Sequence, residues 1–324
     1  MTVSVLPRLA AKARGAAHPD GTPCACGAAV TLADRPDATV VRHADVVAKA
    51  HAPDTDRAGL DARLATAARL PDVFVPPLGT APVTLGDRLA TLWPYGTPVD
   101  PHTPDAAPWE AAGTLLARLH RTPATGPVTA TLRAAPAPPP MRGPLKAARA
   151  ITRLGAALAT AGTPAAPPVL RAWKALPAWA RAAAPMPGPA ALCHGDVHLG
   201  QLVRHPAPDG PWRLIDVDDL GVGVPAWDLA RPAAWYACGL LPPDEWTRFL
   251  TAYRAAGGPA VPVHGDPWPA LDVPARALTA QTAAVAVAKA LAADRPLDEV
   301  AAALVDACAR MDRAPAELAP EFPT

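Results

Sequence analysis

Two acidic clusters within residues 192–219 carry side chains that could do phosphate chemistry. Asp196 lies in the first cluster, Gln201 follows five positions later, and Asp216 begins the second cluster after an apolar run. An aspartate can accept the proton of an attacking hydroxyl. Carboxylate and amide oxygens suit a hard cation that also keeps waters and substrate phosphate. Asp196 is therefore a candidate to accept such a proton, and Gln201 and Asp216 are candidate ligands of such a cation.

These clusters need strands to position them. Each lies beside an apolar strand-like run, and the loop between them holds two prolines, an aspartate and a glycine within residues 206–210. Turn residues between two apolar runs predict a β-hairpin. Because side chains alternate along a strand, Asp218 points the same way as Asp216. Asp218 is thus an additional candidate for the metal or the acceptor, whereas Asp219 fits a solvated turn equally well.

The spacing from Asp196 to Gln201 is that of the kinase catalytic loop, and Asp216 takes the place of the D-F-G aspartate. This spacing predicts Asp196 as the catalytic residue and Gln201 and Asp216 as magnesium ligands. Three ordered motifs extend this pattern. They are HGDVHLGQ at 194–201, LIDVD at 214–218 and GVPAWDLA at 223–230. Together they resemble the aminoglycoside phosphotransferase superfamily, which includes choline kinase-like and maltokinase-like enzymes and usually reads H-G-D-x-H-x-x-N, I-D-F and D-P-x-x-D-L-A.

The resemblance implies an α/β fold of the protein-kinase type with two lobes. A small, β-rich, nucleotide-binding lobe would span 1–94, and a large, mostly helical lobe with the acceptor pocket would span 95–324. It also implies a kinase that uses ATP or GTP with Mg²⁺ and has a hydroxyl as acceptor. In the family the aspartate that matches Asp228 is mainly structural and ties the catalytic segment to the large lobe.

Gln201 departs from the family's usual asparagine, and the form HGDxHLGQ resembles the maltokinase branch. Glutamine offers the same carbonyl oxygen one methylene further out. The chain contains no asparagine and only two glutamines, Gln201 and Gln281. Because one of these two glutamines lies at the expected metal position, a functional role for it is favoured over a neutral replacement of the asparagine.

Lys49 is the candidate contact for the nucleotide phosphates. Three β-branched runs, at 30–32, 39–41 and 46–50, predict an antiparallel meander that Lys49 closes. It is one of five lysines among 30 basic residues and resembles the V-A-I-K lysine of kinases. The alternative is a solvent-facing lysine. In the family a helical acid pairs with this lysine, and Asp61, in a predicted helix over 54–70, is the first candidate.

Asp56 is the second candidate for that pairing, and an exposed helical acid is the alternative for both. The turn at residues 33–38 lacks the glycines that let backbone amides approach phosphate, and it carries Asp34 and Asp37 instead. This departure weakens the expectation of ATP binding. It leaves open a pseudokinase, a binding or scaffold module without turnover.

His194 and His198 lie four residues apart, a spacing that could bind zinc on a helix. Here the pair falls in a glycine-containing loop without a third ligand at a family spacing. We favour structural hydrogen bonding that holds the Asp196 loop, with His198 as an additional site residue.

Composition limits the other function classes. Of the 324 residues 50% are hydrophobic, and the net charge is +1. A net charge this small produces no positive field that would attract nucleic acid. The N-terminus has no unbroken apolar run, so we expect no membrane segment and a cytoplasmic protein. Five cysteines are an odd count, and Cys24-Ala25-Cys26 is tighter than a usual zinc knuckle, so reduced thiols are the simpler interpretation.

The remaining segments are predicted from pattern and order along the chain. In the first part of the chain we predict an extension or short helix over 1–27, strands over 83–93 and an adenine-contacting hinge at 94–98. In the second part we predict helices over 106–121, 147–184 and 245–311, a proline-rich loop over 122–144 and a frayed end at 320–324.

Three acceptor classes stay open. Four acids near the site permit a polycationic aminoglycoside without requiring it: Asp218, Asp219, Asp244 and Glu245. A neutral sugar is the rival suggested by the glutamine form of the loop. A serine or threonine of a peptide in a biosynthetic pathway is the third.

Overall fold

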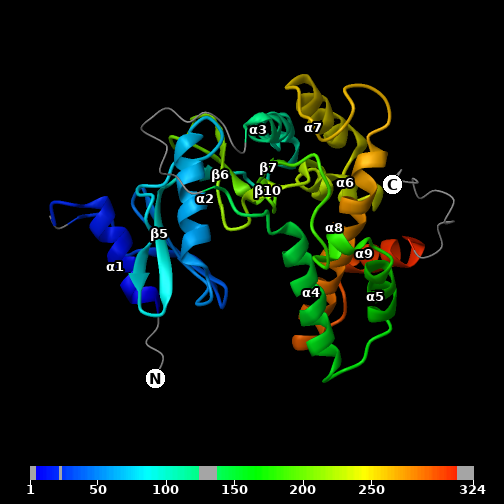
Figure 1. The fold of residues 1–324 in the computed structure, drawn as a ribbon. Helices are drawn as coiled ribbons and strands as arrows, with labels where there is room; N and C mark the ends of the chain where they lie inside the picture. Colours follow the sequence, from blue (N-terminus) through cyan, green and yellow to red (C-terminus); the bar gives the residue numbers. More distant parts are fainter. Residues whose placement is uncertain (1–4, 22–23, 124–136, 312–324) are drawn as a thin grey trace. The chain divides into compact units, whose positions relative to one another are not determined.

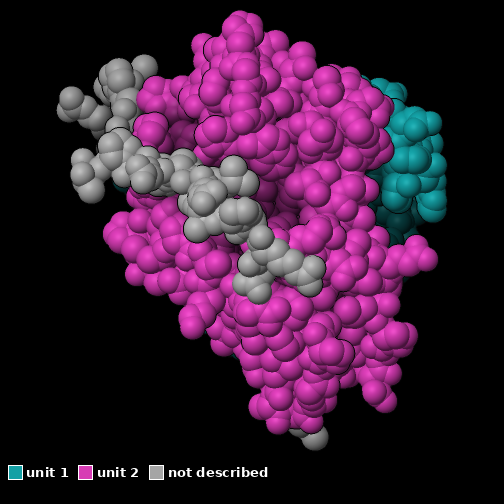
Figure 2. All heavy atoms as spheres, turned by 90° about the vertical axis from the view of Figure 1, so that its right-hand side faces the viewer, with its two compact units in different colours: residues 1–108, 124–139, 199–218 teal, residues 109–123, 140–198, 219–324 magenta. Residues whose placement is uncertain are grey.

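The computed structural model describes residues 5–21, 24–123 and 137–311, and the chain divides into two compact units. Unit 1 comprises 1–108, 124–139 and 199–218, and unit 2 comprises 109–123, 140–198 and 219–324 (Figure 2). These units are not the two continuous segments, 1–94 and 95–324, expected from the sequence. Residues 199–218 belong to unit 1 because they form a sheet with residues 97–98.

The centre of unit 1 is a five-stranded antiparallel sheet. Its order is β1-β2-β3-β5-β4, with β1 at Val30–Arg35, β2 at Ala38–His43, β3 at Val46–His51, β4 at Val83–Leu85 and β5 at Arg88–Pro94. The predicted meander of the first three strands is confirmed, and so are strands over 83–93. Helix α1 (Val5–Ala17) precedes the sheet, and α2 (Arg57–Arg69) connects β3 to β4 (Figure 1).

The two faces of this sheet have different neighbours. Val41 pairs with Ala48 across β2 and β3, and both pack with Leu9 and Ala13 of α1 in one buried cluster. Because side chains alternate along a strand, Lys49 points to the opposite face. Helix α1 therefore covers one face, and the face that carries Lys49 is turned away from it.

The predicted helix over 54–70 is α2, and Asp56 is its N-cap. The Asp56 carboxylate accepts hydrogen bonds from the amides of Ala58 and Gly59 at 3.1 and 2.9 Å. These bonds satisfy two amides that a helix start leaves without partners. Asp56, the second candidate to pair with Lys49, is thus used at the helix end.

The predicted hairpin is also confirmed. Strand β8 (Leu202–Arg204) pairs antiparallel with β9 (Trp212–Leu214), and β6 (Thr97–Pro98) pairs with the other edge of β8. Leu214 is fully buried and its carbonyl accepts from the amide of Val75 at 3.0 Å. This contact anchors the strand that leads directly into Asp216.

Unit 2 is mainly helical. Its helices are α3 (Trp109–Arg121), α4 (Gly143–Leu158), α5 (Ala166–Lys174), α6 (Ala230–Ala237), α7 (Pro243–Ala255), α8 (Trp268–Ala292) and α9 (Glu299–Met311). Two short strands, β7 (Ala191–Cys193) and β10 (Gly221–Gly223), pair antiparallel. Single 3-10 turns occur in both units, at Pro104–Ala106, Ala178–Arg181, Leu199–Gln201 and Pro225–Trp227.

Helix α8 is central to the core of unit 2. Its buried Ala283 and Ala284 pack in one cluster with Leu154 of α4, Val169 of α5 and Leu304 of α9. Small alanine side chains let neighbouring helices approach closely, so the alanine-rich sequence favours this packing.

The helices predicted over 106–121 and 245–311 are present, with breaks where α7 and α8 end. The helices predicted over 147–184 are also present, as α4, α5 and the 3-10 turn at Ala178–Arg181, with a break between Leu158 and Ala166. Residues 124–136 of the predicted loop, and 320–324, lie outside the described residues. Among the residues described, no helix is both long and apolar enough to cross a membrane.

Candidate active site

Lys49 is held between two carboxylates in unit 1. Its Nζ lies 2.6 Å from Asp216 Oδ1 and 3.0 Å from Asp218 Oδ2, and its side chain is only 12% exposed. Burial alone would lower the pKa of this ammonium, but the two carboxylates outweigh it and raise the pKa of Lys49 above its ordinary value. Lys49 therefore stays charged.

Asp218 has a second basic neighbour, His51. The Nδ1 of His51 lies 3.0 Å from Asp218 Oδ1, and its Nε2 lies 2.9 Å from the hydroxyl of Thr91. Burial opposes ionisation of Asp218, but Lys49 and His51 hold the pKa of its carboxyl well below the usual range. The sequence analysis did not single out His51, although alternation along β3 places positions 49 and 51 on the same face.

Asp216 has a backbone conformation that is rare for a residue with a side chain. Its φ is +65°, in the left-handed region. The amide of Ile215 donates to the carbonyl of Gln201 at 2.9 Å, so the last residue of the 3-10 turn before β8 fixes the backbone just before Asp216. Such strain persists only where neighbouring contacts enforce it and often occurs at functional positions.

Gln201 lies beside Asp216. Its amide nitrogen is 3.4 Å from Asp216 Oδ2. Since the nitrogen and oxygen of an amide exchange by rotation, the same side chain can present its oxygen. Gln201, Asp216 and Asp218 then form an all-oxygen set, the kind of donors that Mg²⁺ prefers.

Asp61 lies on α2, and Lys49 is not among its contacts in the part of the chain that the structure describes. The Oδ1 atom of Asp61 is buried without a hydrogen-bond partner there. Its pairing with Lys49 stays a prediction.

Asp196 is surrounded by positive charge within unit 2. Lys146 Nζ of α4 lies 2.5 Å from its Oδ2, and an Nη atom of Arg231 of α6 lies 2.8 Å from its Oδ1. Burial opposes ionisation, but Lys146 and Arg231 hold the pKa of this carboxyl well below its usual range. Asp196 is thus ionised, and a basic side chain holds each of its two carboxylate oxygens in place.

Lys146 is shared between two acids. It also lies 3.0 Å from Asp219 Oδ2, and Arg142 lies 3.7 Å from Asp219 Oδ1. Burial would lower the pKa of Lys146, but Asp219 and Asp196 raise it above its ordinary value. The sequence analysis did not identify Lys146 or Arg231. The scarcity of lysine was the one signal that could have drawn attention to Lys146.

Asp228 joins the Asp196 loop to the helices of unit 2. Its carboxylate accepts from the backbone amides of His194 at 2.6 Å and Gly195 at 2.7 Å, and it lies 3.0 Å from His120 Nε2. His120 Nδ1 is 2.8 Å from the hydroxyl of Tyr253. Asp228 and His120 are buried, so this carboxylate fixes the loop from inside the core.

Gly195 is required by the shape of the same loop. Its φ is +88°, and a Cβ at this position would lie 2.5 Å from the carbonyl oxygen of Asp219. Glycine adopts this conformation without strain and leaves room for the neighbouring backbone. The loop before Asp196 therefore depends on the absence of a side chain at 195.

The two histidines of the loop differ in environment. His194 is buried, and its Nδ1 accepts from the amide of Asp196 at 3.4 Å. Burial lowers the pKa of His198 to about 4, against the opposing effect of Asp196, so its ring is neutral at pH 7. Among the described residues, neither histidine belongs to a converging group of three or more His, Cys, Asp or Glu donors, which removes support for zinc here.

The glycine-poor turn between β1 and β2 uses its acids locally. Asp34 accepts from the hydroxyl of Thr39 at 3.1 Å, and Asp37 lies 3.7 Å from Arg35. Both carboxylates thus have partners within the hairpin.

These contacts make up two arrangements. Unit 1 holds a half-buried ammonium against two carboxylates, one of which also contacts an amide, and unit 2 holds an ionised aspartate on a loop fixed by hydrogen bonds. The first suits a phosphate and a hard cation, and the second suits a hydroxyl. Residues 34–268, which contain both, match the model of the phosphotransferase enzyme family.

The chain belongs to this family. It is therefore a phosphotransferase, as the motifs indicate. No curated protein sequence matches the chain.

Solved structures of kinases share the fold. A choline/ethanolamine kinase family protein from Mesorhizobium loti is 18% identical, with 96% of this chain and 94% of that chain covered and a TM-score of 0.52. A thermostable mutant of the aminoglycoside phosphotransferase APH(4)-Ia is 12% identical, with 89% and 94% covered and a TM-score of 0.57. Spectinomycin phosphotransferase APH(9)-Ia, solved with ADP and spectinomycin, is 12% identical, with 89% and 93% covered and a TM-score of 0.53. The expected mixed α/β, protein-kinase-like fold is thereby confirmed.

Proposed function

We propose that this phosphotransferase transfers the γ-phosphate of ATP, with Mg²⁺, to a hydroxyl of a neutral, sugar-like small molecule. The observation that carries the proposal is the buried Lys49 between Asp216 and Asp218, with the amide of Gln201 at the same carboxylate. This set offers one fixed cation for phosphate and oxygen ligands for a metal.

The nucleotide half of the reaction rests on unit 1. Lys49 supplies a positive charge for phosphate oxygens, while Gln201 and Asp216, with Asp218 beside them, would hold the metal. Bound Mg²⁺ would neutralise charge that develops on the transferred phosphate. His51, whose Nδ1 lies 3.0 Å from Asp218 Oδ1, gives this carboxylate a basic partner besides Lys49.

The acceptor half rests on Asp196. Its carboxylate orients the hydroxyl and accepts the proton at one oxygen, as the new oxygen–phosphorus bond forms, the bond from the γ-phosphorus to the bridging oxygen breaks and ADP leaves. Because Lys146 and Arg231 keep Asp196 acidic, it is a weak base. Its main contribution is therefore position, which suits a reaction in which the attacking oxygen forms its bond late.

The charges around Asp196 favour a neutral acceptor over a polycation. Lys146, Arg231 and Arg142 provide three positive charges against the two of Asp196 and Asp219. Two of the other acids that permitted an aminoglycoside are also engaged: Asp218 pairs with Lys49, and Glu245 accepts from Trp109 Nε1 at 2.6 Å. A polycationic substrate would meet repulsion from this group.

The test is a phosphotransfer assay with the full chain, Mg²⁺ and ATP against two panels, neutral sugars and aminoglycosides. We expect ADP release and a phosphorylated product with at least one neutral sugar. Asp196→Asn should lower kcat by about a thousandfold or more while the protein stays folded, because the positioned carboxylate is lost.

Arg149→Gln, at an exposed position of α4, is the control for a change of charge in unit 2. Turnover only with aminoglycosides would overturn the neutral acceptor, and turnover only with serine- or threonine-containing peptides would favour the peptide alternative. Binding of ATP without transfer to any acceptor would favour a pseudokinase.

A further inference from the structure

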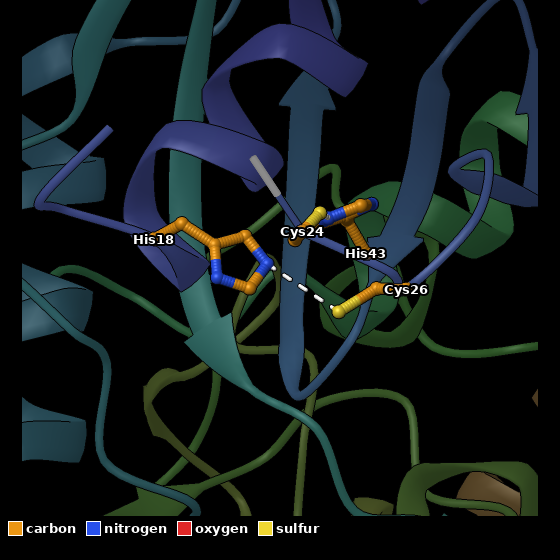
Figure 3. A group of neighbouring side chains, drawn as sticks. All are labelled: His18, Cys24, Cys26 and His43. Carbon is orange, nitrogen blue, oxygen red and sulfur yellow. Dashed lines mark hydrogen bonds between the residues drawn. The ribbon is translucent and has the colours of Figure 1, made fainter. Parts of the chain in front are cut away.

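Four metal-binding side chains converge in unit 1, outside the site described above. They are His18, Cys24, Cys26 and His43, and their donor atoms all lie within 4.8 Å of one another. Figure 3 shows the four side chains gathered between the end of α1 and strand β2. His18 directly follows α1, the cysteines lie in the segment before β1, and His43 is the last residue of β2.

The distances suit ligands of one small ion. Cys24 Sγ lies 3.3 Å from His43 Nε2, and Cys26 Sγ lies 3.5 Å from His18 Nε2. In a tetrahedral zinc site, with Zn–S of about 2.3 Å and Zn–N of about 2.0–2.1 Å, the sulfur–nitrogen edge is about 3.6 Å. The two pairs are therefore spaced as two edges of a tetrahedron.

A thiol–imidazole hydrogen bond would explain the short distance within each pair. Such bonds give no reason for the two pairs to lie next to each other. The rings of His18 and His43 lie 5.3 Å apart between centroids and almost perpendicular, so both pairs share one small volume. Both cysteines are free thiols, and His43 is buried.

We propose that His18, Cys24, Cys26 and His43 bind one zinc ion that fastens the N-terminal helix to the sheet of unit 1. Two sulfurs and two imidazole nitrogens in a tetrahedral arrangement are typical of structural zinc. The spacing of Cys24-Ala25-Cys26 alone is tighter than that of a usual zinc knuckle. The structure supplies the two missing ligands from segments on either side of it.

The position of the ion explains its role. Leu9 and Ala13 of α1 pack on the sheet face that also carries His43, and Lys49 lies on the other face. The ion would close the chain between residues 18 and 43 and so hold α1 on that face. Three of the four ligands precede the family match at residue 34, so the match to the phosphotransferase family does not imply this site.

The test is a titration of the reduced, chelator-treated full chain with cobalt(II), followed by zinc. We expect one equivalent of cobalt to give the strong visible bands of tetrahedral geometry and a thiolate charge-transfer band in the near ultraviolet. Zinc should displace the cobalt and raise the unfolding midpoint. Cys26→Ser and His43→Ala should each weaken binding by at least about a hundredfold and remove the zinc-dependent rise.

Two matched controls replace the same residue types elsewhere in the described chain. Cys238→Ser and the exposed His264→Ala should retain the wild-type spectrum. Asp216→Asn should retain it too, so a failure of nucleotide binding is separable from a failure of this site. A cobalt spectrum without thiolate charge transfer, or one unchanged in Cys24→Ser and Cys26→Ser, would overturn the proposal, as would a disulfide between Cys24 and Cys26 in the purified protein.

Discussion

Asp196 and Lys49 each lie between two groups of opposite charge. Lys146 and Arg231 flank the aspartate, and Asp216 and Asp218 flank the lysine. Removal of one flanking group would leave a charge in a partly buried place with half of its compensation, which is costlier than the loss of an exposed ion pair. At the residue scale the charge of Asp196 therefore depends on Lys146 and Arg231, which lie outside the sequence motifs.

His198 predicts a pH dependence. Its pKa is about 4 in the folded chain against an ordinary 6.5, so between these values the unfolded chain binds a proton that the folded chain rejects. The free energy of unfolding therefore falls as pH falls from about 6.5 toward 4. In His198→Gln the fall in the free energy of unfolding on acidification should be smaller than in the wild type by on the order of 2 kcal/mol. Urea denaturation of both proteins at pH 7 and 4.5 measures it, and equal losses in the two would contradict the assignment.

At the scale of elements, short strands and one buried carboxylate fix the position of the loop that carries Asp196. Strand β7 leads into the loop and pairs with β10, while the carboxylate of Asp228 accepts hydrogen bonds from the amides of His194 and Gly195. Strand β9 in turn leads into Asp216. Two short strands thus lead directly into the loops that carry Asp196 and Asp216.

Gly195→Ala should destabilise this loop. The added methyl group would meet the carbonyl of Asp219, and alanine is strained at a φ of +88°. We expect a loss of about 1–3 kcal/mol in the free energy of unfolding and a lower kcat. Gly155→Ala in α4 is the matched control, because nothing lies within 4 Å of its Cβ position and alanine should stabilise the helix by up to about 1 kcal/mol. Equal effects of the two substitutions would refute the steric account.

For the whole molecule, a ligand that binds only the folded chain must raise its stability. With Mg²⁺ and ATP at 100 times the dissociation constant, the gain is about 2.7 kcal/mol. We expect a rise in the unfolding midpoint that requires both Mg²⁺ and nucleotide and is lost in Lys49→Met and Asp216→Asn. Lys289→Met, on an exposed position of α8, should keep the rise. The same rise in Lys49→Met would show that the nucleotide binds elsewhere.

The sequence by itself determined the family, the strands of the meander, the hairpin and the residues Lys49, Asp196, Gln201 and Asp216 as candidates. These inferences succeed because alternation, turn residues and motif spacing are local properties of the chain. Gln201, Asp216 and Lys49 meet in the folded unit 1, whereas the pairing of Asp61 with Lys49 stays a prediction.

Only the tertiary structure decided which distant side chains meet. Lys146 and Arg231 reach Asp196 from 50 and 35 positions away, and His43 reaches Cys24 from 19 positions away. No periodicity or spacing encodes such pairs, because they form when helices and strands pack by burying apolar surface, and the polar side chains between them then find partners. The charge environment of Asp196 and the convergence of His18, Cys24, Cys26 and His43 are therefore properties of the fold.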